Sequence, residues 1–188
     1  MSSKVDARRA KVSRATRETK VEVEIDIDGK GDVSGSVQDE FLRHMVETLG
    51  KYSGSDIVIR AEGDMAHHLV EDVAITLGHA YRKALGDAPI VRIADATVPM
   101  DEALVQVVVD LIDRPFVDLE VPNQIYEHFM RSFAMELRAT IHTRVIRGRD
   151  EHHILEAIFK ALGIALRKAM TPAPSAVSTK SSVKWRHS

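Results

Sequence analysis

The chain has 188 residues, a formal net charge of −2 and no cysteine, and 44% of its residues are hydrophobic and 29% charged. This composition is typical of a protein with one or two compact units, and it excludes disulfide bonds, thiol catalysis and cysteine-bound zinc. The nearly balanced charge argues against a nucleic-acid partner, and no apolar run is long enough to cross a membrane. The N-terminal segment is polar and lacks the apolar core of a signal peptide, so we expect a cytoplasmic protein.

The first half of the chain predicts two strands and two helices. Residues 20–27 alternate between apolar and polar side chains, which is typical of a half-buried strand. Apolar residues recur at helical spacing from Asp39 to Leu49, and Gly50 is expected to end this helix. A second strand is predicted over Asp56–Ala61 and a second helix over residues 66–85.

The second half repeats this order. Its predicted strands are Leu104–Asp110, Phe116–Val121 and Thr140–Ile146, and its predicted helices are Ile125–Leu137 and His152–Met170. An internal duplication explains the repeat, with a first half-repeat at residues 1–98, a second at 99–170 and a polar tail at 171–188. Each half would place two helices on one face of a small, mostly antiparallel sheet, which is an α+β arrangement.

The most informative feature is the string His-His-x-x-Glu, which occurs at residues 67–71 and again at 152–156. Both copies open a predicted helix. Residues three or four apart share a helix face, so each glutamate lies one turn beyond both histidines of its string. Neutral imidazoles and a carboxylate at this spacing are ligands that divalent transition metals prefer. A single His-His pair is usually a solvated helix start, but its repetition in corresponding places favours a metal centre.

The two strings together predict two metal ions. Adjacent histidines diverge by about 100° around a helix, so one ion cannot easily bind both rings of a pair. Each pair suits two ions, one on each side. His44 and His142 are further candidate ligands, which would give each ion three histidines and one glutamate and leave positions open for substrate or water. Such nitrogen-rich sites suit manganese, iron, cobalt or nickel better than magnesium or calcium. The other histidines, His79, His128 and His187, are interpreted as surface or core residues.

These motifs resemble the imidazoleglycerol-phosphate dehydratase family from about Arg9 to Lys180. The matching segments are RxTxETxVxVxIxxDGxG at residues 14–31, HM at 44–45, HHxxED at 67–72, PMDEA at 99–103, DRP at 113–115, HHxxEAxFKA at 152–161 and STK at 178–180. The family removes water from imidazole glycerol phosphate to give imidazole acetol phosphate in histidine biosynthesis. The resemblance implies the same activity, and a duplicated half-fold of four strands and two helices like that of ribosomal protein S5 domain 2.

The resemblance also implies a homo-oligomer of 24 subunits, with two manganese ions in each active site and the active sites at subunit interfaces. The implied metal ligands are His44, His67, His68, Glu71, His142, His152, His153 and Glu156. Glu18 is the implied proton-transfer group. The residues implied to bind the substrate, mainly its phosphate, are Arg92, Asp101, Arg114, Lys160, Ser178 and Lys180. Lys160 also follows from spacing, because it lies one helical turn after Glu156. We expect residues 178–180 to order over bound phosphate as a partial lid.

The chain departs from the usual family sequence at Arg43, Thr48 and Tyr52, near the first histidine ligand. Two other classes of function share the metal ligands. A dinuclear metallohydrolase would use a hydroxide that bridges the two ions, and it would not need several cationic side chains around one phosphate. A non-catalytic metal-bridged assembly protein would not need Glu18 at all.

Overall fold

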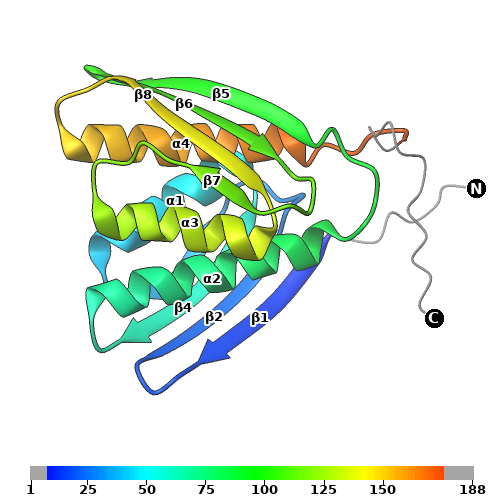
Figure 1. Cartoon of the computed structure of the whole chain (residues 1–188). Helices are drawn as coiled ribbons and strands as arrows, with labels where there is room; N and C mark the ends of the chain where they lie inside the picture. The colour runs from blue at the N-terminus through cyan, green and yellow to red at the C-terminus, as the bar shows by residue number, and fades with distance from the viewer. Residues whose placement is uncertain (1–7, 176–188) are drawn as a thin grey trace, which may run out of the picture.

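The computed structural model describes residues 8–175, which form two halves with the same order of strands and helices (Figure 1). The first half contains β1 (Arg9–Ala15), β2 (Thr19–Asp26), β3 (Val33–Val37), α1 (Glu40–Ser53), β4 (Asp56–Gly63) and α2 (Ala66–Leu85). The second half contains β5 (Ile93–Met100), β6 (Ala103–Asp110), β7 (Phe116–Asp118), α3 (Gln124–Leu137), β8 (Thr140–Arg147) and α4 (Glu151–Ala169). The predicted duplication is confirmed.

Each half folds into one mixed sheet of four strands. The strand order is β1-β2-β4-β3 in the first sheet and β5-β6-β8-β7 in the second. In each sheet two neighbouring pairs are antiparallel, and the last pair, β3 with β4 or β7 with β8, is parallel. Every second residue of the central strands β2 and β6 is buried, as expected when helices cover one face of a sheet. The predicted α+β fold class is confirmed.

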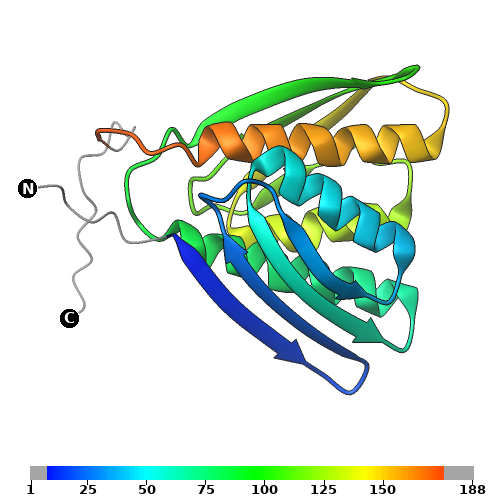
Figure 2. The same cartoon turned by 180° about the vertical axis from the view of Figure 1, so that it is seen from behind.

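The helices lie between the two sheets and join the halves (Figures 1 and 2). α2 packs against α3, and α1 packs against α4, so each contact pairs one helix from each half. Phe129, Phe133 and Phe159 are fully buried in this layer. Glycine allows the close approach of the helices, since a Cβ atom at Gly78 would lie 2.6 Å from the carbonyl oxygen of Phe133, and one at Gly163 would lie 2.8 Å from Tyr52 Cβ.

The end of α1 differs from the prediction. The helix continues through Gly50 to Ser53 and ends at Gly54, which has a φ of 74°. Helices often end at a residue with positive φ, and this residue is usually glycine because glycine adopts the conformation without steric cost. Gly50 serves packing instead, since a Cβ atom there would lie 2.3 Å from Val33 Cγ2 on the neighbouring strand.

Some strands also differ from the prediction. β7 ends at Asp118, before the predicted end at residue 121. β5 begins at Ile93 and pairs with β6, so the second sheet starts before residue 99, where the second half-repeat was expected to begin. The strands β1, β3 and β5 were not predicted as strands. All three lie at the edges of their sheets, where a strand needs backbone hydrogen bonds on one side only.

The four helices begin at the same end of the molecule, which brings the two histidine strings to that end (Figure 1). Side chains of Asp39, Asn123 and Asp150 accept hydrogen bonds from the first backbone N–H groups of α1, α3 and α4. α2 follows Met65 and has no such side-chain cap. No helix within residues 8–175 combines the length and the apolar character that crossing a membrane requires.

Candidate metal centre

Three of the predicted ligands meet where α1 of the first half packs on α4 of the second. His44 Nε2 lies 3.4 Å from Glu156 Oε2, and His152 Nε2 lies 3.3 Å from the same oxygen. The two imidazole rings are nearly parallel, with their centroids 6.0 Å apart. Within residues 8–175 this is the one group of three or more histidine, cysteine or acidic side chains whose donor atoms, all within 4.8 Å of one another, could hold a metal ion.

The carboxylate of Glu156 is fixed on its other side by Lys160. Lys160 Nζ lies 2.8 Å from Glu156 Oε1, 3.2 Å from Met100 Sδ and 5.8 Å from the centre of the Tyr52 ring. Burial alone would raise the pKa of Glu156, but hydrogen bonds from Lys160 and His44 lower it below the usual value. Glu156 is therefore ionised, with one oxygen held by Lys160 and the other facing the two histidines.

The string of the first half lies at the start of α2, beside the turn between β1 and β2. His68 Nδ1 is 2.9 Å from Asp64 Oδ1 and 3.6 Å from Oε2 of Glu18, which is exposed in that turn. The hydrogen bond with Asp64 raises the pKa of His68. Asp64 was not predicted to contribute to the site. The structure thus brings the predicted proton-transfer residue next to one of the predicted metal ligands.

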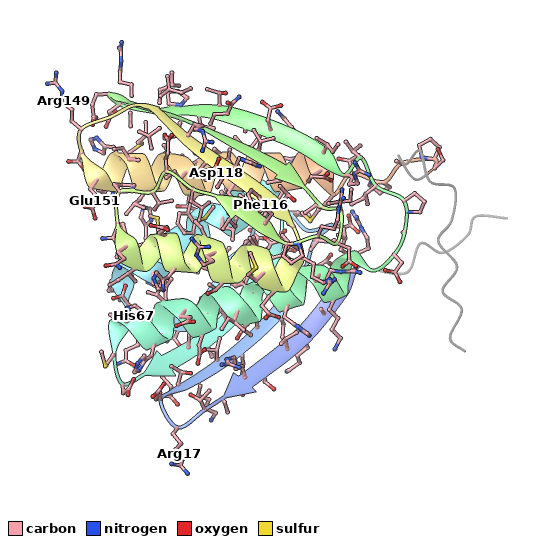
Figure 3. The ribbon with its side chains drawn as sticks, in the orientation of Figure 1. Arg17, His67, Phe116, Asp118, Arg149 and Glu151 are labelled. Carbon is pink, nitrogen blue, oxygen red and sulfur yellow. The ribbon has the colours of Figure 1, made fainter. Side chains whose placement is uncertain are left out.

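His67, the first histidine of the same string, faces His128 of α3. Their ring centroids are 5.2 Å apart, and Figure 3 shows His67 at the start of α2. This contact mirrors the one between His44 and His152, because in both cases the first histidine of a string meets a histidine from the first helix of the other half. His128 was interpreted as a residue without a metal role, although its place in the repeat corresponds to that of His44.

His153 is held by the turn between β5 and β6. Its Nδ1 lies 2.7 Å from Glu102 Oε2, and its Nε2 lies 3.5 Å from Asp101 Oδ2. Backbone N–H of Asp150, the His153 ring and backbone N–H of Arg149 together lower the pKa of Glu102 to about 2, and Glu102 in turn raises the pKa of His153. Glu102 was missed as a supporting residue. Its place in the PMDEA motif, next to the predicted substrate-binding Asp101, was the available signal.

His142 lies apart from these groups, on β8. Its Nδ1 is 3.6 Å from Asp118 Oδ2 and its ring centroid is 5.7 Å from that of Phe116, both on the neighbouring strand β7 (Figure 3). Arg144 lowers the pKa of Asp118, so this carboxylate is ionised beside His142. Within the part of the chain that the structure describes, a single copy therefore gathers only three of the eight predicted ligands.

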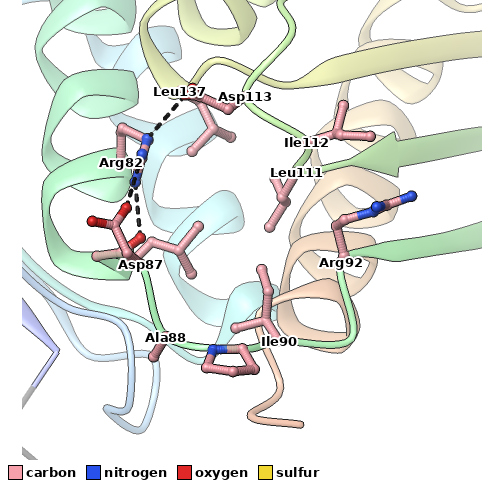
Figure 4. Close-up of a pocket in the computed structure, with 12 residues that line it drawn as sticks. Arg82, Asp87, Ala88, Ile90, Arg92, Leu111, Ile112, Asp113 and Leu137 are labelled. Atoms are coloured by element: carbon pink, nitrogen blue, oxygen red, sulfur yellow. Dashed lines mark hydrogen bonds and ion pairs between the residues drawn. The ribbon is translucent and has the colours of Figure 1, made fainter. Parts of the chain in front are cut away.

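The predicted substrate-binding residues also lie at separate places in one copy. Arg92 Nε lies 2.8 Å from Asp110 Oδ1. Arg92 also lines a pocket of about 300 Å³ with Arg82 and Asp113, although its side chain points away from those two residues (Figure 4). The loop between β6 and β7, which carries the exposed Arg114, is at the same end of the molecule, opposite the helix starts (Figure 1). Lys160 is at the three-ligand group instead. Ser178 and Lys180 lie outside the described residues.

The donor atoms of the three-ligand group fit a divalent transition metal. Two imidazole nitrogens and a carboxylate oxygen form a mixed set without thiolate, which suits a divalent transition metal better than calcium, whose ligands are all oxygens. The backbone N–H of His152 donates to Asp150 Oδ1 at 2.8 Å, which holds the first turn of α4 and thus the ligand-bearing face in place.

The family model for imidazoleglycerol-phosphate dehydratase matches residues 37–166, which include both histidine strings. The chain belongs to this family. It is 45% identical over 186 residues to the imidazoleglycerol-phosphate dehydratase of Kineococcus radiotolerans, a match that covers 89% of this chain and 94% of the relative. It is 46% identical over 178 residues to that of a Parafrankia species, with 87% and 91% covered.

Solved structures of imidazoleglycerol-phosphate dehydratases have the same fold. The structure from Pyrococcus furiosus superposes with a TM-score of 0.81 at 38% identity, and the match covers 92% of this chain and 100% of the other. The structure from Staphylococcus aureus superposes with a TM-score of 0.79 at 31% identity, with 88% and 99% covered. The dehydratase fold therefore extends over both halves of this chain.

Proposed function

We propose that this protein dehydrates imidazole glycerol phosphate to imidazole acetol phosphate, a step of histidine biosynthesis. The observation that carries the proposal is the meeting of His44, His152 and Glu156 across the two halves, in a chain that belongs to the imidazoleglycerol-phosphate dehydratase family. These donors are of the kind that a metal-dependent dehydratase needs. The relatives with this name match nearly their whole length, so the proposal concerns the complete activity and not one domain of it.

The proposed cofactor is a pair of manganese ions. Three donors from one copy leave an octahedral ion short of ligands, and the other predicted ligands lie in separate groups of the same copy. We therefore propose that each site is completed when copies meet, which agrees with the homo-oligomer of 24 subunits that the resemblance implies. In this arrangement His67, His68, Glu71, His142 and His153 would complete sites formed with neighbouring copies.

The reaction removes a hydroxyl group from the carbon attached to the imidazole ring and a proton from the neighbouring carbon. The enol that results becomes the ketone of the product. When bound, the manganese ions would polarise the imidazole ring and stabilise the negative charge that develops on it. Glu18 is exposed and lies 3.6 Å from His68, so its carboxylate can reach a substrate bound beside α2 and accept the proton.

The phosphate group requires cationic partners. Arg92 and Arg114 lie at one end of a single copy and Lys160 lies at the three-ligand group, and we propose that these side chains converge on one phosphate when copies assemble. Ser178 and Lys180, which lie outside the described residues, would add a hydroxyl group and a second amine. Asp101 would contact the substrate near His153, 3.5 Å away. Tyr52 packs against Lys160 and limits the positions that its amine can take.

The decisive experiment is a turnover assay of the manganese-loaded protein. Imidazole glycerol phosphate and a panel of phosphoesters are compared as substrates, and the release of inorganic phosphate is measured alongside the ketone product. We expect ketone without phosphate release. Hydrolysis of the phosphoesters without dehydration would show a dinuclear metallohydrolase and overturn the proposal.

The variant Glu18→Gln tests the proton-transfer residue. We expect it to lower kcat by about 100-fold or more, because general acid–base catalysis contributes about that much, while manganese content and assembly stay unchanged. Glu24→Gln is the matched control, since Glu24 is on the same hairpin and forms an exposed ion pair with Lys11. Full turnover by Glu18→Gln would reject this role, and the absence of turnover in every variant, wild type included, would favour a non-catalytic assembly protein.

A further inference from the structure

Asp72, the residue after Glu71 in the first histidine string, has surroundings that the proposed chemistry does not explain. It is 8% exposed, so its carboxylate is largely removed from water. Burying a carboxylate costs free energy unless charged or hydrogen-bonding partners compensate for the lost water. The partners of Asp72 should therefore show why a buried charge is placed beside the candidate metal ligands.

Both oxygens of Asp72 are bound by residues of the β1–β2 hairpin. Arg14 Nε lies 2.9 Å from Oδ1, and the hydroxyl group of Thr19 donates to Oδ2. On the helix side, Thr76 Oγ1 donates to the carbonyl oxygen of Asp72 at 2.7 Å. Arg14 and Thr19 flank the turn that carries Glu18, so Asp72 fastens this turn to α2 from both of its strands.

The turn itself is closed by further hydrogen bonds around Glu18. Thr16 Oγ1 accepts from the backbone N–H of Glu18 at 3.1 Å and from that of Thr19 at 3.0 Å. The carbonyl oxygen of Glu18 accepts from the backbone N–H of Asp64 at 3.0 Å, and the Asp64 side chain binds His68. The backbone of Glu18 is thus held within the turn and also to the segment that leads into α2.

We propose that Asp72 is a positioning residue, which clamps the β1–β2 turn to α2 and so keeps the carboxylate of Glu18 beside His68. This inference rests on the proposed role of Glu18 in proton transfer. A misplacement of a reacting group by about 1 Å can lower the rate by about 100-fold, so a rigid attachment of an otherwise exposed turn has a direct catalytic use. Asp72 is not itself a candidate metal ligand, because both of its oxygens are engaged by Arg14 and Thr19.

The first test is Asp72→Asn in the manganese-loaded, assembled protein. The amide keeps the shape but weakens the attraction for Arg14, so we expect kcat to fall by about 10- to 100-fold while KM for the substrate changes by less than about twofold. Manganese content, assembly and manganese affinity, measured by calorimetric titration, should stay unchanged. Asp26→Asn is the matched control: Asp26 is on β2 and ion-pairs with Arg9 of β1 at 2.6 Å, at the end of the hairpin opposite the turn, and its loss should leave kcat unchanged.

A second pair of variants keeps the proposal testable if Asp72→Asn fails to fold. Thr19→Val removes the hydroxyl group that donates to Asp72 but keeps the shape of the side chain, whereas Thr19→Ser keeps the hydroxyl group. We expect Thr19→Val to lower kcat by about 10-fold and Thr19→Ser to keep it close to the wild-type value. A purely structural role of the threonine methyl group would give the opposite order.

The outcomes separate the two proposals. If Glu18→Gln keeps full turnover, the proton-transfer role fails, and with it the premise of the inference. If Glu18→Gln is inactive but Asp72→Asn and Thr19→Val keep the wild-type kcat, the role of Asp72 is wrong and the proposed function stays. If Asp72→Asn loses manganese, Asp72 supports the metal ligands of α2 rather than Glu18, which also overturns the inference.

Discussion

The two histidine strings occupy equivalent places in the duplicated fold but have different surroundings. At the start of α4, Asp150 caps the helix, Glu102 holds His153, and Lys160 holds Glu156 opposite His44 and His152. At the start of α2, Met65 provides no cap, and the nearby acidic residues come from the β1–β2 turn and the preceding loop.

This comparison shows what duplication preserves and what it does not. Each half keeps the same ligand types at the same helical spacing, because the spacing is a property of the local sequence. The neighbours come from other elements and have diverged. The second string forms a group of three donors with His44 of the first half, whereas the first string places His68 beside Glu18, the candidate proton-transfer residue.

The largest expected effect is on manganese affinity, and it compares the glutamates of the two strings. Glu156→Gln and Glu71→Gln should each lower manganese affinity by more than about 100-fold, because losing a ligand costs more than losing a residue that merely supports one. Calorimetric titration of the metal-free protein measures affinity and stoichiometry. Glu136→Gln, in α3, is the control. Unchanged binding by Glu71→Gln would mean that only the second half supplies a metal-binding glutamate.

The next effect compares the two helix contacts that join the halves, α2 with α3 and α4 with α1. Gly78→Ala and Gly163→Ala should each destabilise the protein by about 1–3 kcal/mol, because the added methyl group would overlap atoms of the facing helix. In a helix without such a neighbour, the same change would stabilise by about 1 kcal/mol. Urea unfolding of the metal-free protein measures the difference, with the exposed neighbour His79→Ala as reference. Stabilisation by either glycine substitution would show that the helices can move apart at no cost.

The capping difference between α2 and α4 gives a smaller effect of predictable sign. Asp150→Ala should lower the free energy of unfolding by about 1 kcal/mol, since Asp150 accepts from the backbone N–H groups of His152 and His153. Met65→Asp should raise it by up to about 1 kcal/mol, because Met65 has the extended φ and ψ of a cap residue but no acceptor. Thermal unfolding of the metal-free variants decides both. A change of the same sign in both variants would contradict the difference in capping.

The smallest effect concerns the loops before β3 and β7, which are bound by the first residues of β4 and β8. Asp56 Oδ1 accepts from the backbone N–H groups of Lys30, Gly31 and Asp32, and these bonds lower the pKa of Asp56 below the usual value of 3.8. The corresponding loop of the second half uses a hydroxyl group instead, with Thr140 donating to the carbonyl oxygen of Arg114.

Asp56→Asn should therefore cost less than about 1 kcal/mol at neutral pH, since the carboxylate is largely solvated. A lowered folded-state pKa means that the stabilisation is complete above about pH 4 and is lost as pH falls further, because protonation of the folded protein removes the charge. Urea unfolding between pH 7 and pH 2 should show the wild type and the variant converging at acid pH. A difference that persists at pH 2 would contradict the charge-based account.

Much of the fold could be predicted from the sequence because its central elements have strong periodic patterns. The strands β2, β4, β6 and β8 and all the helices were predicted, since one face of each packs on the core and is therefore apolar. The edge strands were harder. β3 contains serine and glycine, and β5 contains Asp95 and Pro99, so neither shows clear alternation, and backbone pairing with the next strand determines their conformation.

The sequence by itself determined the duplication, the fold class and the types of ligand, because these follow from repeated strings and from helical spacing. Only the tertiary structure decided which ligands meet. His44 and His152 come from different halves and are joined by the packing of α1 on α4, and His128 meets His67 by the packing of α2 on α3. The burial of Asp72 under the β1–β2 hairpin is likewise a long-range contact. Such contacts depend on how helices and sheets pack, which local patterns along the chain do not encode.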